Sequence, residues 1–220
     1  MTAIDLHWQS PEVVYVFDGY CGWCYGFDET LMAFWQANRH RVPFRVVSGG
    51  LFVGANKPRI GTLGFIREAN ARVTQYTGAQ FGDGFDAVLR DGSLVLDSEA
   101  AAAGFAALRE QAPERAVEIA AAMQHAFYID GRSLSDPDTF ADVARTLQLD
   151  AARVRAFMTG PQGGMAATED FALARALGAT SFPTLLVVSD GFISPLPRIG
   201  ASVQMLTRHL DAALSARAAS

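Results

Sequence analysis

The apolar positions of the chain fall into two kinds of run, and the first stretch holds both. Residues 13–17 are β-branched or aromatic, which is typical of a short buried strand, and Asp18-Gly19 ends the run. From Gly22 to about Arg39 the apolar side chains recur at helical spacing, and a second strand pattern follows at residues 42–47. Strand, helix and strand together take about 30 residues, which is the size of one βαβ unit.

The middle of the chain, from about Leu63 to Gly178, has a different pattern. It is rich in alanine, poor in β-branched runs and divided by residues that favour helix starts. The clearest start is Ser135-Asp136-Pro137-Asp138, which combines a capping side chain, an early proline and acids near the positive end of a helix. Other helices are expected at Ser98 to Gln111, after Pro113, at 150–159 and at 164–177.

The strand pattern returns after this helical stretch, at Thr184–Val188. A last short strand is expected at Arg198-Ile199-Gly200, before a closing helix from Ser202 to about Ala216. Because no repeat or polar linker divides the chain, the pattern predicts an α/β core that is interrupted by an all-helical insertion. The core would be residues 1–62 and 179–220, and the insertion residues 63–178.

Composition and charge narrow the functional classes. The 220 residues are 50% apolar and 19% charged, which is ordinary for a globular protein with its own core. A net charge of −5 argues against a broad nucleic-acid surface. The N-terminus, MTAIDLHWQSPE, lacks the features of a secretory signal, and no apolar run reaches the roughly 20 residues that span a bilayer. We therefore expect a cytoplasmic protein with neither nucleic-acid nor membrane partners.

Both cysteines of the chain lie in one short segment, Cys21-Gly22-Trp23-Cys24. In the reducing cytoplasm such a pair is more often catalytic or metal-binding than structural. Thiol–disulfide exchange needs a thiolate, and the unpaired N–H groups at a helix start favour negative charge there. Since Cys21 falls at the predicted helix start, it is the candidate nucleophile, and Cys24, one turn inside, is the candidate resolving thiol.

Other interpretations of these residues are weaker. The cysteines could form a buried inert pair, or a metal site that needs two further ligands. The histidines that could supply them, none spaced as a second half-site, are His7, His40, His125 and His209. Residues 82–87 fit Gly-x-Gly-x-x-Ala in letters, but no apolar strand precedes them, so we interpret them as a turn. The sequence therefore predicts no metal and no bound cofactor.

Three segments carry a family resemblance. They are Val14–Gly26, with a strand followed by Asp-x-x-Cys-x-Trp-Cys-Tyr, then Phe127–Asp136, and then Ala174–Thr184, which ends in Phe-Pro-Thr. In order and spacing they resemble the DsbA family of thioredoxin-fold oxidoreductases, and within it a cytoplasmic branch of proposed protein-disulfide isomerases. The resemblance implies a thioredoxin-like fold with a large all-helical insertion.

The resemblance also implies roles for two residues far from the cysteines. Pro183 matches a proline that in thioredoxin folds is cis and faces the cysteines, and the backbone of Phe182 would pair with an incoming peptide. A proline imide adopts the cis form at modest cost, and its nitrogen has no proton to offer a nearby sulfur. From the sequence alone, an ordinary trans turn before a strand is the alternative.

Two departures from the family pattern bear on the chemistry. Many members have a buried acid six positions before the first cysteine, where this chain has Tyr15. Asp18 is the nearest acid and the candidate substitute for the missing proton acceptor of Cys24. The Gly22-Trp23 spacer lacks the histidine that stabilises the thiolate in strongly oxidising members. We therefore expect the cysteine pair to have a less oxidising redox potential, like that of a reductase or an isomerase.

Three functional hypotheses follow. The leading one is a thiol–disulfide oxidoreductase that acts on protein or small-molecule disulfides, with glutathione as a candidate thiol co-substrate. The second is a glutathione-dependent transferase or isomerase of the kappa or hydroxychromene-carboxylate isomerase type, whose members place a serine at the first site. The third is a metal-stress or chaperone-like binding protein.

Overall fold

The computed structural model describes residues 10–189 and 192–218, with the backbone alone for the last two. Residues 1–9, which include His7 and most of the segment considered for a signal peptide, lie outside the described part. The same holds for residues 190–191, which follow the strand expected at Thr184–Val188. Within the described ranges, no helix is long and apolar enough to cross a bilayer.

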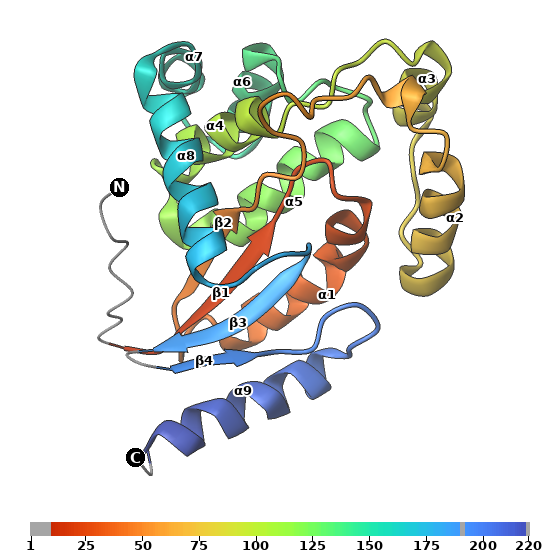
Figure 1. The fold of residues 1–220 in the computed structure, drawn as a ribbon. Coiled ribbons are helices and arrows are strands. Elements are labelled where there is room, and N and C mark those ends of the chain that lie inside the picture. The colour runs from red at the N-terminus through yellow and green to blue at the C-terminus, as the bar shows by residue number, and fades with distance from the viewer. Residues whose placement is uncertain (1–9, 190–191, 219–220) are drawn as a thin grey trace.

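The predicted βαβ unit is confirmed. Strands β1 (Glu12–Phe17) and β2 (Phe44–Ser48) pair in parallel and are joined by α1 (Gly22–Asn38). Strand β3 (Thr184–Ser189) returns from the far end of the chain to pair antiparallel with β1, and β4 (Phe192–Pro195) pairs antiparallel with β3. The four-stranded order β2-β1-β3-β4 places β1 inside the sheet, as Figure 1 shows.

Alternate residues of β1 face two different helical layers, because successive side chains of a strand point to opposite faces. Tyr15 and Phe17 pack in the main core with α1 and with α9 (Val203–Ala218). Val14 and Val16 pack against the C-terminal part of α8 (Pro161–Ala176). All four are fully buried, as expected for a strand that is covered on both faces.

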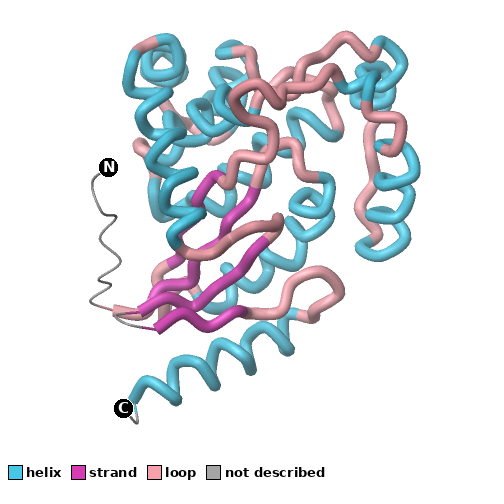
Figure 2. Tube along the Cα trace, viewed as in Figure 1, coloured by secondary structure: helices cyan, strands magenta, loops and turns pink. Residues whose placement is uncertain are grey.

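Between β2 and β3 the described chain is helical apart from loops and one isolated bridge, as predicted and as Figure 2 shows. Although α8 lies in this stretch, it packs directly on the sheet, so the proposed division at residues 62 and 178 stays a prediction. The remaining elements are η1 (Ile60–Thr62), α2 (Ile66–Thr77), α3 (Asp83–Asp91), α4 (Ser98–Arg109), η2 (Pro113–Arg115), α5 (Ala116–Tyr128), α6 (Pro137–Thr146) and α7 (Ala151–Thr159).

Local sequence signals explain where several of these helices begin. Helix α6 starts as predicted, with Pro137 in its first position and the Asp136 carboxylate accepting from the Asp138 N–H. Helix α8 starts at Pro161, three residues earlier than expected. Gly163 in this first turn is closely packed, since a Cβ there would lie 3.0 Å from the Phe157 carbonyl oxygen.

Two sequence interpretations are wrong. Arg198-Ile199-Gly200 is a loop and turn rather than a strand, and the last strand is β4. The chain leaves the sheet after Pro195 and Leu196 because Pro197 has no N–H to continue the ladder. Residues 82–87 are not a simple turn, since α3 begins at Asp83 with Gly82 as its N-cap. The segment directly before them is a loop and not a strand, as the sequence indicated.

An ion pair from the helical stretch covers the outer edge of β2. Arg109, at the end of α4, pairs with Asp170 of α8 through two hydrogen bonds of 2.9 and 3.0 Å. The same guanidinium donates to the Val46 carbonyl oxygen at 2.7 Å, and the Ser48 N–H donates to the Asp170 carboxylate at 2.9 Å. The two side chains thereby bind backbone groups of β2 that a neighbouring strand would otherwise bind.

Replacing Arg109 with methionine should lower the free energy of unfolding by about 2 kcal/mol, because the buried Asp170 carboxylate loses its cation. The value lies below that for a fully buried pair because the Arg109 side chain is partly exposed. The matched control is Arg153→Met, which breaks the exposed pair with Glu110 and should cost less than about 1 kcal/mol. Denaturant unfolding measures both, and equal losses would contradict the role assigned to Arg109.

Candidate active site

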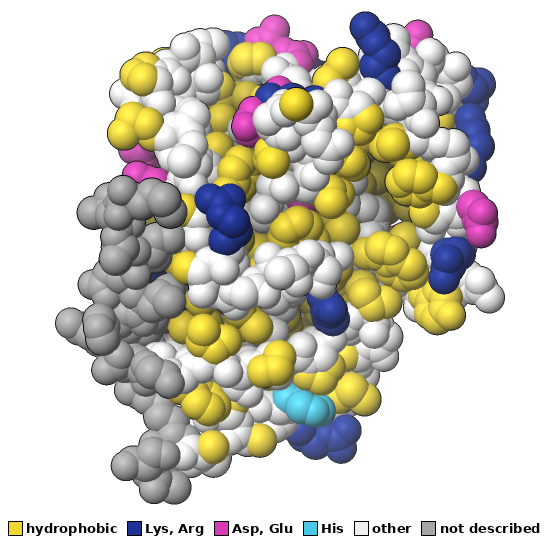
Figure 3. Space-filling view, in the orientation of Figure 1, with side chains coloured by type: hydrophobic (Ala, Val, Ile, Leu, Met, Phe, Trp, Pro, Cys, Tyr) yellow, Lys and Arg dark blue, Asp and Glu magenta, His cyan; other side chains and the backbone are white. Residues whose placement is uncertain are grey.

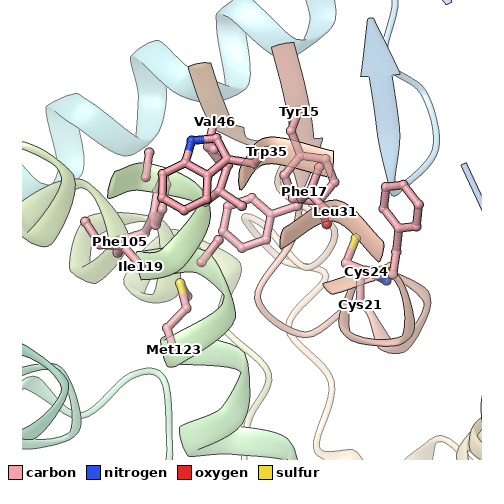
Figure 4. Close-up of a cluster of buried hydrophobic side chains, with 14 of the residues drawn as sticks. Tyr15, Phe17, Cys21, Cys24, Leu31, Trp35, Val46, Phe105, Ile119 and Met123 are labelled. Carbon is pink, nitrogen blue, oxygen red and sulfur yellow. Dashed lines mark hydrogen bonds between the residues drawn. The ribbon is translucent and has the colours of Figure 1, made fainter. Parts of the chain in front are cut away.

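Cys21 is the N-cap residue of α1. Its backbone is extended, and its Sγ accepts a hydrogen bond from the Cys24 N–H at 3.4 Å. The sulfur therefore lies where the first N–H groups of the helix are unpaired, which favours negative charge on it. Both cysteines are free thiols, and Figure 4 shows them together at the start of the helix. Cys21 is 7% exposed and Cys24 is 0% exposed, so the first sulfur alone is within reach of a substrate.

The structure brings Phe182 and Pro183 to this helix start. The Phe182–Pro183 peptide bond is cis, and the Cys21 thiol donates to the Phe182 carbonyl oxygen at 3.5 Å. The phenylalanine ring lies against Gly49, just after β2, where a Cβ would come within 2.0 Å of the ring. Gly49 is a residue that the sequence analysis missed, because the need for a glycine arises from a side chain more than a hundred positions away.

Asp18 ties the segment before the cysteines to the loop after β2. It is buried, and its two carboxylate oxygens accept from the Tyr20 N–H at 2.9 Å and the Leu51 N–H at 2.8 Å. Burial raises the pKa of Asp18, while the hydrogen bonds from Leu51 and Tyr20 act in the opposite direction. The contacts of Asp18 are those of a positioning residue, and its role as the proton acceptor of Cys24 stays a prediction.

A pocket of about 470 Å³ lies beside Cys21, between the helix start and α2. The spacer residues Gly22 and Trp23 line it, as does Phe182, and none of its lining side chains is charged. Trp23 contacts Tyr76 of α2 edge-to-face, with 6.0 Å between the ring centroids. Figure 3 shows hydrophobic side chains gathered between α2 and the body of the molecule. The arrangement suits an apolar group placed next to a reacting sulfur.

A second, larger cavity of about 1120 Å³ runs along β2, and none of the predicted site residues lines it. Its walls carry many charged side chains, among them the Arg109–Asp170 pair. We place the candidate active site at the smaller pocket because the one partly accessible thiol of the described chain lines it.

Tyr15 of β1 lies beneath the second cysteine. Figure 4 shows its hydroxyl oxygen facing the Cys24 sulfur. The ring is fully buried between Phe17, with 5.6 Å between the centroids, and Phe27, at 6.3 Å. Within the described chain the hydroxyl has no hydrogen-bond partner of normal geometry. Burial raises the pKa of Tyr15 well above its usual value, and the nearby Cys24 raises it further.

Two further polar residues near the cysteines were missed. Gln124 of α5 is fully buried, and its amide donates to the carbonyl oxygens of Asp18 and Cys21 at 3.3 and 3.4 Å. With the amide rotated, the same side chain would donate to both carboxylate oxygens of Asp28 at 3.2 Å. Burial raises the pKa of Asp28 well above its usual range. The sequence could have identified Asp28, since it lies one helical turn after Cys24 and so on the same face of α1.

Cys24 is held as a protonated thiol. Burial raises its pKa well above the usual value, and the neighbouring Cys21 raises it further, whereas a backbone hydrogen bond from Asp18 acts in the opposite direction. A thiol whose pKa is raised keeps its proton at neutral pH.

Among the described residues there is no group of three or more His, Cys, Asp or Glu side chains that could hold a metal ion, either around the cysteines or elsewhere.

Comparisons with known proteins agree with this geometry. A family model described as the DSBA-like thioredoxin domain matches residues 12–206. A candidate protein disulfide isomerase from Nitrosomonas europaea shares the fold, with a TM-score of 0.80 and 20% identity over 94% of this chain and 99% of its own. None of the curated proteins matches the sequence. The predicted fold class is thus confirmed.

A second solved structure is more similar in sequence. The cytosolic disulfide reductase DsbM from Pseudomonas aeruginosa is 27% identical over 93% of this chain and 99% of its own, with a TM-score of 0.78. A structure of DsbM with GSH gives a TM-score of 0.75 at 26% identity, with the same coverage.

Replacing Gly49 with alanine should slow the reaction of Cys21 with a model disulfide by about 10- to 100-fold, because the Phe182 ring must shift and displace the carbonyl oxygen that lies beside the sulfur. The matched control is Gly64→Ala, since no atom lies within 4 Å of a Cβ at Gly64. Stopped-flow kinetics on both variants tests this, and a Gly49→Ala protein as fast as the control would contradict the packing argument.

Proposed function

Because the chain belongs to the DSBA-like thioredoxin domain family, and is accordingly a thiol–disulfide oxidoreductase, we propose that it reduces disulfides through Cys21 and Cys24. One observation carries the proposal. The Cys21 sulfur caps α1, lies 3.5 Å from the Phe182 carbonyl oxygen and lines a pocket, while Cys24 is fully buried one turn inside the helix.

The proposed reaction has two steps. The Cys21 thiolate attacks one sulfur of a disulfide RS–SR′, which forms a Cys21–SR mixed disulfide and releases R′S⁻. Cys24 then gives up its proton, and its thiolate attacks the Cys21 sulfur, so that the enzyme disulfide forms and RS⁻ leaves. The proton of Cys24 ends on a departing thiolate. The raised pKa of Cys24 supports this order, since a buried neutral thiol does not compete with Cys21 for the substrate.

Two observations support a reducing direction in the cytoplasm. The spacer Gly22-Trp23 has no histidine to stabilise the Cys21 thiolate. The relative at 27% identity is named a cytosolic disulfide reductase. Isomerase activity would use the same first step. Cys24 would then release Cys21 from mixed disulfides that do not rearrange, by attacking the Cys21 sulfur.

The pocket indicates what kind of substrate is favoured. Its uncharged, mainly apolar walls fit an apolar side chain beside the substrate disulfide, and the Phe182 backbone lies next to the reacting sulfur. The DsbM structure with GSH supports glutathione as the thiol co-substrate. Because no cation lines the pocket, the carboxylates of glutathione would find no ion pair there, so we infer weak binding that suits a reductant.

The glutathione-dependent transferase or isomerase is the second candidate. The pocket beside Cys21 is large enough for a small apolar substrate, and this observation favours it. That chemistry gives no role to a fully buried second thiol directly beneath the first. Disulfide reduction uses both sulfurs, so it accounts for more of the site.

Exchanging the two cysteines separately tests the assigned roles. Cys21→Ser should abolish the reduction of insulin disulfides, because the attacking sulfur is gone. Cys24→Ser should keep the first step and accumulate mixed disulfides at Cys21, which mass spectrometry detects. The two variants control for each other, since both remove one thiol at the same helix start. Unchanged insulin reduction by Cys21→Ser would end the proposal.

The redox potential of the cysteine pair tests the direction. We expect equilibration with glutathione to give a potential below about −200 mV, in the range of reducing thioredoxin-fold proteins. A potential near about −120 mV, at the strongly oxidising end, would contradict the reductase assignment. The fraction of oxidised protein can be read by thiol alkylation and mass spectrometry across a series of glutathione ratios.

A further inference from the structure

The Tyr15 hydroxyl is a buried polar group without a satisfied hydrogen bond. The residue is 0% exposed, and the strand that carries it lies in the interior of the sheet. A buried hydroxyl without a partner costs free energy, so native proteins rarely keep one without a reason. Replacing the tyrosine with phenylalanine would remove that cost and leave the ring packing unchanged. We therefore expect the hydroxyl to gain a hydrogen-bond acceptor at some step of the reaction.

The surroundings favour one such partner, since Cys24 lies within hydrogen-bonding reach of the hydroxyl, whereas Asp28 acts on it through its charge alone. The rings of Phe17 and Phe27 pack against Tyr15 and offer no acceptor to its hydroxyl. The Cys24 sulfur faces the oxygen (Figure 4). A neutral thiol is a weak acceptor, whereas a thiolate accepts a charge-assisted hydrogen bond that is about twice as strong as a neutral one. The partner of Tyr15 would thus exist when Cys24 carries its negative charge.

We propose that the Tyr15 hydroxyl donates a hydrogen bond to the Cys24 thiolate while that thiolate resolves the mixed disulfide on Cys21. The assignment rests on the proposed function and adds a catalytic residue to it, since Tyr15 faces a reacting atom. Tyr15 approaches the sulfur from β1, and the backbone of Asp18 provides a second hydrogen bond from the loop. Two donors then stabilise a negative charge that burial alone would strongly disfavour.

Tyr15 acts as a hydrogen-bond donor and not as the base. Its raised pKa means that it keeps its own proton throughout the step. The electron pair of the Cys24 thiolate forms the bond to the Cys21 sulfur, the bond from Cys21 to the substrate sulfur breaks, and RS⁻ leaves. The proton lost by Cys24 ends on the departing substrate thiolate, so one proton and one negative charge are present on each side of the overall reaction.

Several titratable groups surround the Cys24 sulfur, and each enters the pH dependence. Cys21 at the N-cap of α1 and Asp18 in the loop both raise the pKa of Cys24 when charged. From α5, Tyr128 interacts electrostatically with both cysteines, and burial raises its pKa well above the usual value, so it stays neutral. Asp28 of α1 lies near Tyr15, and its raised pKa favours the neutral acid. Removing the Tyr15 hydroxyl should therefore move Cys24 ionisation to higher pH.

The test separates the two steps with Ellman's reagent, which releases one coloured thiolate when Cys21 attacks and a second when Cys24 resolves. In Tyr15→Phe we expect an unchanged first phase and a second phase about tenfold slower at neutral pH, the loss typical of one hydrogen bond to a charged group. The pH profile of the second phase should move to higher pH. In a Cys21→Ser background, the thiolate absorbance of Cys24 should likewise titrate at higher pH when Tyr15→Phe is added.

Thr139→Val is the matched control. Thr139 of α6 is 1% exposed, and its hydroxyl is also without a partner in the described chain, but it does not line the site. Both variants should raise the thermal unfolding midpoint, because each removes an unsatisfied hydroxyl, and the control should leave both kinetic phases unchanged. A purely structural role for Tyr15 predicts the higher midpoint without the slower second phase.

The outcomes are distinct from those of the proposed function. A wild-type protein that releases no coloured thiolate would overturn the disulfide chemistry itself. Two normal phases in wild type and in Tyr15→Phe, with an unchanged Cys24 titration, would overturn the role of Tyr15 alone. A further measurement uses a protein that keeps the native Tyr15. Ionising Cys24 in Cys21→Ser should perturb the tyrosine absorbance, and a spectrum without that perturbation would contradict the hydrogen bond.

Discussion

The antiparallel pairing of β1 with β3 is the constraint on which the site depends. Its register sets Val16 opposite Thr184, so the end of one strand lies beside the start of the other. The helix that carries both cysteines begins just after β1, and Phe182 and Pro183 come just before β3. Residues 161 positions apart thereby meet at one end of these two strands, and a slip of either strand by one residue would exchange the side chains of its two buried faces.

The region beneath Cys21 concentrates groups that resist ionisation. Cys24, Tyr15 and Asp18 are all buried, and burial raises the pKa of each. A small volume of protein therefore holds a thiol, a phenol and an acid whose charged forms are disfavoured by burial. The more accessible Cys21 lies at the boundary of this region, next to the start of a helix. The difference in environment between two sulfurs one helical turn apart is what allows them separate roles.

Local patterns were enough to predict the βαβ unit, the helix start at Cys21 and the helical middle of the chain, because each depends on residues close in sequence. The last strand was misplaced because the position of β4 and the exit at Pro197 are set by pairing with β3. The roles of Gly49 and Gln124 could not be read from their neighbours, since a distant ring and distant carbonyl groups create them. Segments that far apart meet only through the tertiary fold.

The ion pair on the outer edge of β2 has a consequence for how the chain can be divided. Arg109 and Asp170 belong to the long helical stretch, yet they bind backbone groups of the first fifty residues. Excising residues 63–178 would leave an edge strand with open hydrogen bonds, the usual template for association between chains. The helical stretch is consequently not a removable module, and any shortened descendant of this fold needs another means of closing that edge.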